Sequence, residues 1–229
     1  MHSTALLHLL QLSSPSLPVG AYSYSQGLET AIELKQVHDN ETAFAWITEH
    51  LLRVVAHFEA PLLWRLLHAF LQRDPLAVSS WTEKALAGRD TAEFRAESIQ
   101  MGYSLMKLIR ELNLVDASME KCLPARAEIA DTPFPTAFAC AAIALEMAPE
   151  DALLASLFSW AENQVLVCVK SVPLGQVAGQ RLLLSLRPSI EEAARTAMQL
   201  PDDELSNWAP SLSLYSMRHE VQYSRLYRS

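Results

Sequence analysis

The sequence predicts an all-α protein, a single compact and irregular helical domain with a C-terminal docking tail. Three observations lead to this fold class. Apolar residues make up half of the 229 positions, and they recur at three- and four-residue steps over most of the chain. No segment alternates apolar and polar residues as a half-buried strand does, and no Asn-Gly or Asp-Gly pair marks a hairpin. Charged residues are only 19% of the chain, so the composition favours a packed core over disorder.

Periodicity, capping residues and prolines place the individual helices. The apolar steps between Phe44 and Phe58 predict one helix, and a second is expected after Pro61 and before Asp74-Pro75. Asp74 is expected to cap a third helix that reaches about residue 87, with Gly88 at its end. Further helices are expected from Asp90 or Thr91 through Leu112, from Thr132-Pro133 onward, and near 150–168, 174–186 and 188–199.

The same pattern fixes the expected domain organisation. The connections between the helices are short and no internal repeat divides the chain, so residues 1–209 are expected to form one helical domain. Pro210 is expected to separate this domain from an interaction tail at 210–229.

Net charge, cysteine usage and hydropathy exclude several classes of function. The formal charge is −8, so nucleic-acid binding has no electrostatic support. Three scattered cysteines without a CxxC pair favour the reducing cytoplasm over a secreted disulfide framework. The apolar start of the chain lacks the positive residues of a signal peptide, because the first lysine or arginine is Lys35. The apolar stretch at 165–172 is too short to span a bilayer, so no membrane contact is expected.

Motifs of the common enzyme and metal sites are missing from the sequence. It contains no GxxxxGK[ST], GxSxG or HExxH motif and no paired-cysteine metal site. His50 and His57 lie seven residues apart and can share a helix face, but a third metal ligand is lacking. We therefore expect no catalytic residue, no metal and no cofactor, and a protein that works through its interfaces.

Glycine is scarce in this sequence, and five of the six glycines lie in three short segments. The second segment surrounds Gly102, and the first, 14–29, is rich in proline and hydroxyl groups. This first segment is expected to run as an extended loop into a helix near Tyr24. A long loop in a compact domain is usually functional or disordered. Ordinary capping and helix packing are the alternative for each glycine.

The third glycine segment follows Lys170, the lone lysine of an apolar helix. Such a lysine is costly unless its amine reaches water or a carboxylate. Either the side chain extends into water from a helix end, or it is a positioned cation at a partner surface.

Tyrosine, arginine and leucine dominate the end of the chain, from Arg218 to Ser229. Tyrosine and arginine are enriched at the energetic centres of interfaces, and a free tail of this composition would expose apolar area to water. The tail is therefore expected to dock on a partner, and docking on the chain's own body is the alternative.

Together, the segments 10–29, 170–180 and 218–229 resemble three motifs of the UreF family, in the same order. The region 112–155 carries no such motif. The resemblance implies an all-helical, dimeric protein without catalytic chemistry of its own. It further implies a complex with a UreD-type scaffold and a UreG-type GTPase that carries nickel. This complex would engage apo-urease and couple GTP hydrolysis to nickel insertion.

The resemblance also implies roles for particular residues. Tyr22, Lys170 and Arg225 match motif positions that would face the GTPase. Packing against the scaffold is implied for Met217, Arg218, His219, Glu220, Tyr223, Leu226 and Tyr227. Structural roles within the motifs are implied for Pro18, Gly20, Gly27, Glu29, Pro173, Gly175 and Gln176.

Two other functions are alternatives to a maturation factor that acts only through interfaces. A GTPase-activating or fidelity factor in the strict sense would place Lys170 or Arg225 beside the transferred phosphate, as arginine fingers do. A small-molecule-binding helical enzyme would need a deep apolar pocket with converging polar groups near Tyr22 and Lys170.

Overall fold

The structure is a computed structural model that describes residues 3–123 and 132–229. Within these ranges every regular element is a helix, which confirms the all-α prediction. In chain order the elements are α1 (Ser3–Leu12), η1 (Ala21–Ser23), α2 (Leu28–Glu33), α3 (Asn40–Arg53), η2 (Val55–His57), α4 (Glu59–Leu71), α5 (Pro75–Ala87), α6 (Ala92–Glu111), α7 (Ala117–Glu120), α8 (Phe134–Ala144), α9 (Pro149–Ser171), α10 (Gln176–Ser185), α11 (Arg187–Gln199), η4 (Asp202–Glu204) and α12 (Pro210–Glu220).

Two helices begin at the capping residues that the sequence predicts. The Asp74 carboxylate accepts 3.0 Å hydrogen bonds from the backbone amides of Leu76 and Ala77, at the start of α5. The Thr91 hydroxyl accepts a 3.2 Å bond from the Phe94 amide and caps α6. Both predicted helix starts are confirmed.

The helix expected near Tyr24 begins later than the sequence predicts. The backbone of Tyr24 is extended, and α2 begins four residues later, at Leu28. Gln26 and Gly27 intervene with φ values of 55° and 81°, in the left-handed region that an α-helix cannot contain. The chain therefore turns before it enters α2.

The helix expected through Phe58 ends earlier, at Arg53, and a 3₁₀ turn leads from there into α4. Phe58 instead packs over Gly88, where an added Cβ would lie 1.9 Å from Cζ of the phenyl ring. Gly88 does end α5 as predicted, but its φ of −79° is open to any residue. The close approach of Phe58, rather than the helix end, explains the glycine.

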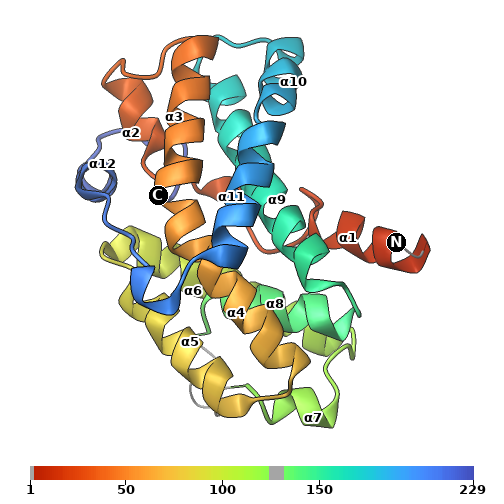
Figure 1. Ribbon diagram of the computed structural model, residues 1–229. Coiled ribbons are helices and arrows are strands. Elements are labelled where there is room, and N and C mark those ends of the chain that lie inside the picture. The colour runs from red at the N-terminus through yellow and green to blue at the C-terminus, as the bar shows by residue number, and fades with distance from the viewer. Residues whose placement is uncertain (1–2, 124–131) are drawn as a thin grey trace.

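The core lies where α4, α6, α8 and α9 pack together (Figure 1). α8 is almost completely buried and rich in alanine, so neighbouring helices approach its backbone closely. A Cβ on Gly102 of α6 would lie 2.0 Å from the carbonyl oxygen of Thr132, just before α8. Phe70, Leu105 and Phe138 fill the space between these helices and are buried.

α9 is the one helix among the described residues that is long and apolar enough to cross a membrane. More than half of its apolar window, 56%, is buried inside the fold, and it packs against α4, α10 and α11. Asn163 and Gln164 are buried in its middle and donate hydrogen bonds to backbone carbonyls. It is therefore a core helix of this fold.

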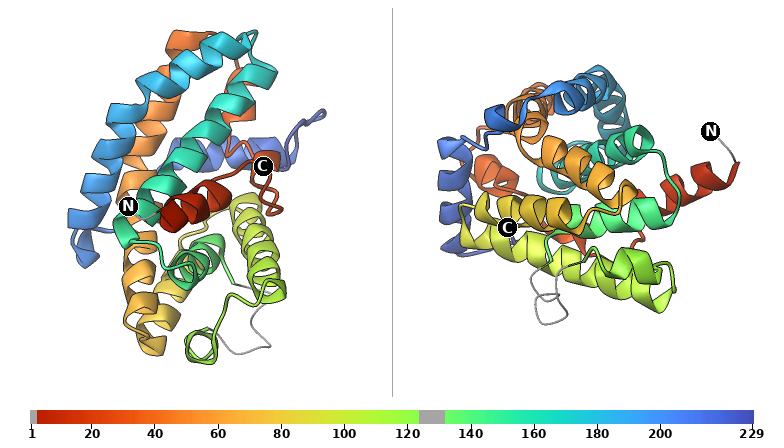
Figure 2. Two further views of the ribbon diagram at one scale, coloured as in Figure 1. Left: turned by 90° about the vertical axis from the view of Figure 1, so that its right-hand side faces the viewer. Right: turned by 60° about the horizontal axis from the view of Figure 1, so that its bottom comes forward.

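The first and the last helix lie on opposite sides of the molecule. α1 projects from one side, whereas α12 lies beside α2 on the other (Figures 1 and 2). Pro210 begins α12, so the first half of the expected tail is a helix, and the chain then turns back towards the body over 221–229. The division into 1–209 and 210–229 stays a prediction.

Candidate interaction site

The end of the chain pairs with the first glycine segment through the backbone. The amide and hydroxyl of Ser25 both donate to the carbonyl oxygen of Ser229, at 2.7 and 2.5 Å. The Arg228 amide donates to the carbonyl oxygen of Ser23 at 2.7 Å. Segments about 200 residues apart in sequence thus lie side by side. We call this region, formed by 22–29, Glu93, Glu97 and 219–229, the tail junction.

Glu29 on α2 holds the terminal turn in place. Its buried carboxylate accepts hydrogen bonds from the backbone amides of Leu226 and Tyr227, at 2.7 and 3.1 Å. Gly27 allows α12 to approach, because an added Cβ would lie 3.2 Å from side-chain atoms of Leu212 and Tyr215. The structural role that the sequence gives to Gly27 and Glu29 therefore has a physical basis in the tail junction.

His219 and Arg225 connect the tail to α6. Both ring nitrogens of His219 face carboxylates, Glu29 at 2.9 Å and Glu93 at 3.0 Å, and the imidazole is completely buried. The Arg225 guanidinium donates to Glu93 at 3.2 Å and stays partly exposed. Two carboxylates and two basic side chains thus meet at this point.

Glu97, one helical turn after Glu93, anchors the last residue. Its carboxylate accepts hydrogen bonds from the Gln26 amide at 2.6 Å and the Ser229 hydroxyl at 2.8 Å. Burial raises the pKa of Glu97 to about 7, although these two hydrogen bonds act in the opposite direction. The Trp160 indole donates to Gln26 at 2.7 Å and joins α9 to the same network.

Tyr22 lies beside this network and binds α9 directly. Its hydroxyl donates a 3.0 Å hydrogen bond to the Glu162 carboxylate. Burial, and then the charge of Glu162, raise the pKa of Tyr22, so the hydroxyl remains a donor. Gly20, just before Tyr22, has a φ of 78° and is exposed, which makes it a turn glycine.

Lys170 is exposed at the C-terminal end of α9, where a positive charge is favourable. Its ammonium lies 5.8 Å from the centre of the Tyr227 ring, within the range of a cation–π contact. It forms no ion pair with the carboxylates that the structure describes. The cation therefore borders the tail junction and faces water.

The turn after Lys170 is mostly exposed. Pro173, Gly175 and Gln176 all face water, and a Cβ on Gly175 would meet nothing within 4 Å. Gly179 differs, because a Cβ there would lie 2.5 Å from Cγ2 of Val169. Packing of α10 on α9 thus explains Gly179 but not Gly175.

The structure divides the seven residues expected at the scaffold interface into two groups. Five are exposed: Met217, Arg218, Glu220, Tyr223 and Leu226. His219 and Tyr227 are buried in the tail junction. The exposed group can touch a partner as it stands, whereas the buried pair shapes the surface from within.

Sequence reasoning missed Glu93, Glu97, Ser25 and Gln26. The spacing of Glu97 does indicate a buried position, because Glu97 lies three residues after Phe94 and four before Met101. It therefore shares the apolar face of its helix. A carboxylate on an apolar face needs buried hydrogen-bond donors. Nothing in the sequence indicates that the donors come from residues 26 and 229.

A cavity of about 130 Å³ lies under the first segment, between α4, α6, α8 and α9. Most of its lining is apolar, and Tyr22, Glu59, Arg89 and Glu97 contribute polar groups. Lys170 is not among the described residues that line it. Tyr22 therefore lines this cavity and Lys170 does not, so the hypothesis that the two residues share this pocket is wrong.

No group of three or more histidine, cysteine or acidic residues in the described ranges is arranged to hold a metal ion. His50 is buried beside Trp160, and burial lowers its pKa to about 4. The isolated protein is therefore expected to bind Ni²⁺ only weakly. Equilibrium dialysis with Ni²⁺ tests this expectation. A stoichiometric site with a Kd of about 1 µM or tighter, lost in a His50→Ala/His57→Ala variant, would contradict it.

Comparison with known proteins defines the class as the urease accessory proteins. A UreF family model matches residues 37–187. The "Urease accessory protein UreF" of Janthinobacterium sp. (strain Marseille) is 68% identical over the full length of both chains. Those of Nitrosospira multiformis and Methylobacillus flagellatus are 61% and 47% identical, over 98% and 99% of each chain. The chain belongs to the UreF family, which places it in urease maturation.

Proposed function

We propose that the chain is a cytoplasmic, non-catalytic maturation factor that binds a UreD-type scaffold and a UreG-type GTPase. As a homodimer in this metallochaperone complex, it assists GTP-dependent insertion of nickel into apo-urease. It uses no cofactor of its own and contacts neither nucleic acid nor membrane. The observation that carries the proposal is the tail junction, which gathers three distant segments around one exposed surface.

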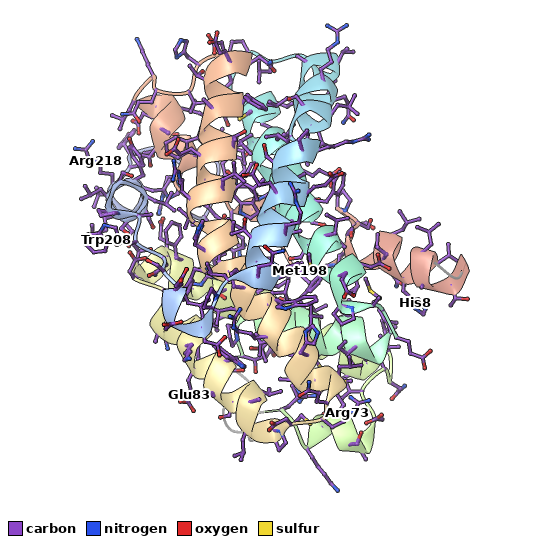
Figure 3. The ribbon with its side chains drawn as sticks, in the orientation of Figure 1. His8, Arg73, Glu83, Met198, Trp208 and Arg218 are labelled. Atoms are coloured by element: carbon purple, nitrogen blue, oxygen red, sulfur yellow. The ribbon has the colours of Figure 1, made fainter. Side chains whose placement is uncertain are left out.

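The outer face of α12 and the tail supports a scaffold interface. Leu214, Met217 and Val221 follow one another at helical spacing and are exposed, Val221 by 84%. Leu226 and Tyr223 continue this apolar surface beyond the helix, and both are exposed. An apolar stripe of this kind on a water-facing helix is typical of a surface that a partner covers. Figure 3 shows the adjoining Arg218 at the outer edge of the molecule.

Three side chains around the tail junction support a GTPase-facing surface. Lys170 and Arg225 place positive charge at this surface of a chain whose net charge is −8, and Tyr22 is the first residue of the tail junction. Such local charge favours an acidic or phosphate-bearing partner and guides its encounter. For the strict GTPase-activating alternative, Lys170 is the better candidate, because Arg225 is held by Glu93.

Lys170→Ala is expected to leave the melting temperature nearly unchanged, because the ammonium faces water and forms no ion pair with the described carboxylates. Loss of an interface cation of this kind should weaken recruitment of the GTPase and reduce GTPase-coupled urease activation by about tenfold. Reconstituted activation of apo-urease, with omission of this chain as the baseline, measures the effect. Arg181→Ala, an exposed cation on α10, is the matched control.

The size of the loss separates the two functions. Removal of a cation that acts at the transferred phosphate would slow hydrolysis by about 10³-fold or more with the complex still assembled. Normal activation by the Lys170→Ala protein would contradict any partner-facing role for this lysine.

A further inference from the structure

The cavity under the first segment is lined by polar groups that the tail junction does not use. Its volume is about 130 Å³. Three buried atoms of its lining residues have no hydrogen-bond partner among the described residues: Ser13 Oγ, Arg89 Nε and Asn163 Oδ1. Buried polar atoms of folded proteins nearly always have such a partner. Three unpartnered atoms around one cavity therefore point to a ligand inside it.

Asn163 shows that the ligand must donate a hydrogen bond. The residue is only 8% exposed, and its Nδ2 donates a 2.9 Å bond to the carbonyl oxygen of Tyr24. This bond fixes the orientation of the side-chain amide, because a flipped amide would turn two oxygens towards each other. Oδ1 is thus an acceptor that lacks a donor, in a residue that lines the cavity. An O–H or N–H group of a ligand would satisfy it.

Arg89 supplies the opposite requirement. Its Nη1 donates to Glu59 in an ion pair, whereas its Nε–H has no partner. The cavity therefore offers a hydrogen-bond donor without a free positive charge. Glu97 also lines the cavity, and its two carboxylate oxygens already accept from Gln26 and Ser229. These pairings favour a neutral ligand over a charged one, because a charged ligand would lose its hydration without gaining a free counter-ion.

The remaining walls set the size and the body of the ligand. Phe134, Phe138 and Trp160 bring aromatic rings to the cavity, and Leu63 and Leu157 are among its aliphatic residues. An apolar cavity of about 150 Å³ in another protein binds benzene. A molecule with one ring, or with about six to eight non-hydrogen atoms, therefore matches this cavity in size.

We propose that this cavity binds a small neutral molecule with an apolar body and one hydroxyl or amide group. Such a group can donate to Asn163 Oδ1 and can accept from the Arg89 Nε–H. A hydrocarbon can do neither, an ammonium cannot accept, and a carboxylate cannot donate. Binding requires no partner protein, so this inference stands apart from the proposed function.

Methyl-labelled methionine reports directly on the cavity. Met101 lines it, whereas Met198 and Met217 do not. In the purified full-length protein, benzyl alcohol is expected to shift the Met101 methyl resonance with a Kd of about 1 mM or tighter. The resonances of Met198 and Met217 are expected to stay in place. No shift at Met101, or equal shifts at all three methionines, would overturn the proposal.

Two probes of similar shape test the chemical class of the ligand. Toluene lacks the hydroxyl group, and benzylamine carries a positive charge at neutral pH. Each is expected to bind about fivefold more weakly than benzyl alcohol, because each leaves a buried polar atom unpaired. Binding of either probe as tightly as benzyl alcohol would overturn the assignment to a neutral hydroxyl or amide compound.

Ala60→Leu tests the location of the site. Ala60 on α4 is 2% exposed and lines the cavity, so the larger side chain is expected to fill it and abolish the Met101 shift. Ala21→Leu fills the cavity from the first segment and replaces Ala60→Leu if that variant does not melt cooperatively. Ala96→Leu, at an exposed position of α6, is the matched control and is expected to keep the shift. An undiminished shift in a folded variant with a filled cavity would place the probe elsewhere and overturn the proposal.

The tail junction provides a second reading of the same site. Gln26 and Glu97 line the cavity, and Glu97 also holds Ser229. Benzyl alcohol at ten times its Kd is therefore expected to slow hydrogen exchange at the amides of Ser25 and Arg228, which pair the first segment with the tail, by up to about tenfold. Unchanged exchange at these amides with the Met101 methyl fully shifted would rule out any effect of the ligand on the tail junction.

Discussion

Replacement of Met217 and Val221 by aspartate is expected to abolish co-purification of this chain with a UreD-type scaffold. Met217 lies on α12 and Val221 follows its last residue, and both side chains are exposed, so the fold itself does not need them. Two buried aspartates in an apolar interface would each lack a partner and would cost several kcal/mol of binding free energy. Affinity co-purification from cells that express both proteins measures the loss.

Leu76→Asp is the matched control, because Leu76 is 81% exposed on α5 and lies outside the proposed interface. Deletion of 217–229 is expected to abolish co-purification as well, while the helical core still melts cooperatively. Arg225→Ala is expected to keep the scaffold and weaken recruitment of the GTPase. A scaffold that co-purifies at full yield with both the aspartate variant and the truncated chain would rule out α12 and the tail as its binding surface.

Glu97→Gln is expected to stabilise the protein at pH 8 by up to about 3 kcal/mol. Burial raises the pKa of Glu97 from 4.5 to about 7, so the folded chain holds this proton more tightly than the unfolded chain does. The free energy of unfolding therefore falls as the pH rises from about 4.5 to about 7 and levels off above. Glutamine is neutral at every pH. Its amide group can donate a hydrogen bond to the Ser229 hydroxyl, which now donates to the Glu97 carboxylate.

Urea unfolding at pH 5 and pH 8 checks this expectation. The gain should be large at pH 8 and small at pH 5. Glu83→Gln, on the exposed face of α5, controls for the loss of one negative charge. A Glu97→Gln protein that is no more stable than the wild type at pH 8 would show that Glu97 is not an uncompensated buried charge.

Local features of the fold were predictable, and the features that depend on distant contacts were not. Asp74 and Thr91 begin helices as expected, because a capping side chain bonds to amides two or three residues away. The late start of α2 is a local exception, because the left-handed conformation of Gln26 has no clear signal in the sequence. Gly88 does end α5 as predicted, but its close contact with Phe58, which lies 30 residues earlier in the chain, has no signal in the sequence.

The candidate site divides in the same way. The sequence singled out the segments that contain Ser25 and Ser229, but their pairing spans the whole chain and has no local pattern. The spacing of Glu97 places it on the apolar face of its helix, but the sequence does not indicate that residues 26 and 229 supply its hydrogen-bond donors. Glu93 carries no such signal, and its partners His219 and Arg225 come from the end of the chain. The resemblance implies that His219 packs against a partner. The structure buries His219 in the tail junction, beneath the surface at which Arg225 is exposed.

The central claim is that this chain acts by binding a scaffold and a GTPase. The most direct measurement is a pull-down of the full-length protein from cells that express the urease operon, with mass-spectrometric identification of the bound proteins. We expect UreD-type and UreG-type proteins, together with apo-urease, to be enriched over a control that carries the Met217→Asp/Val221→Asp variant. Absence of these proteins from the wild-type sample would contradict the claim, whereas equal recovery with both baits would contradict only the placement of the scaffold interface on Met217 and Val221.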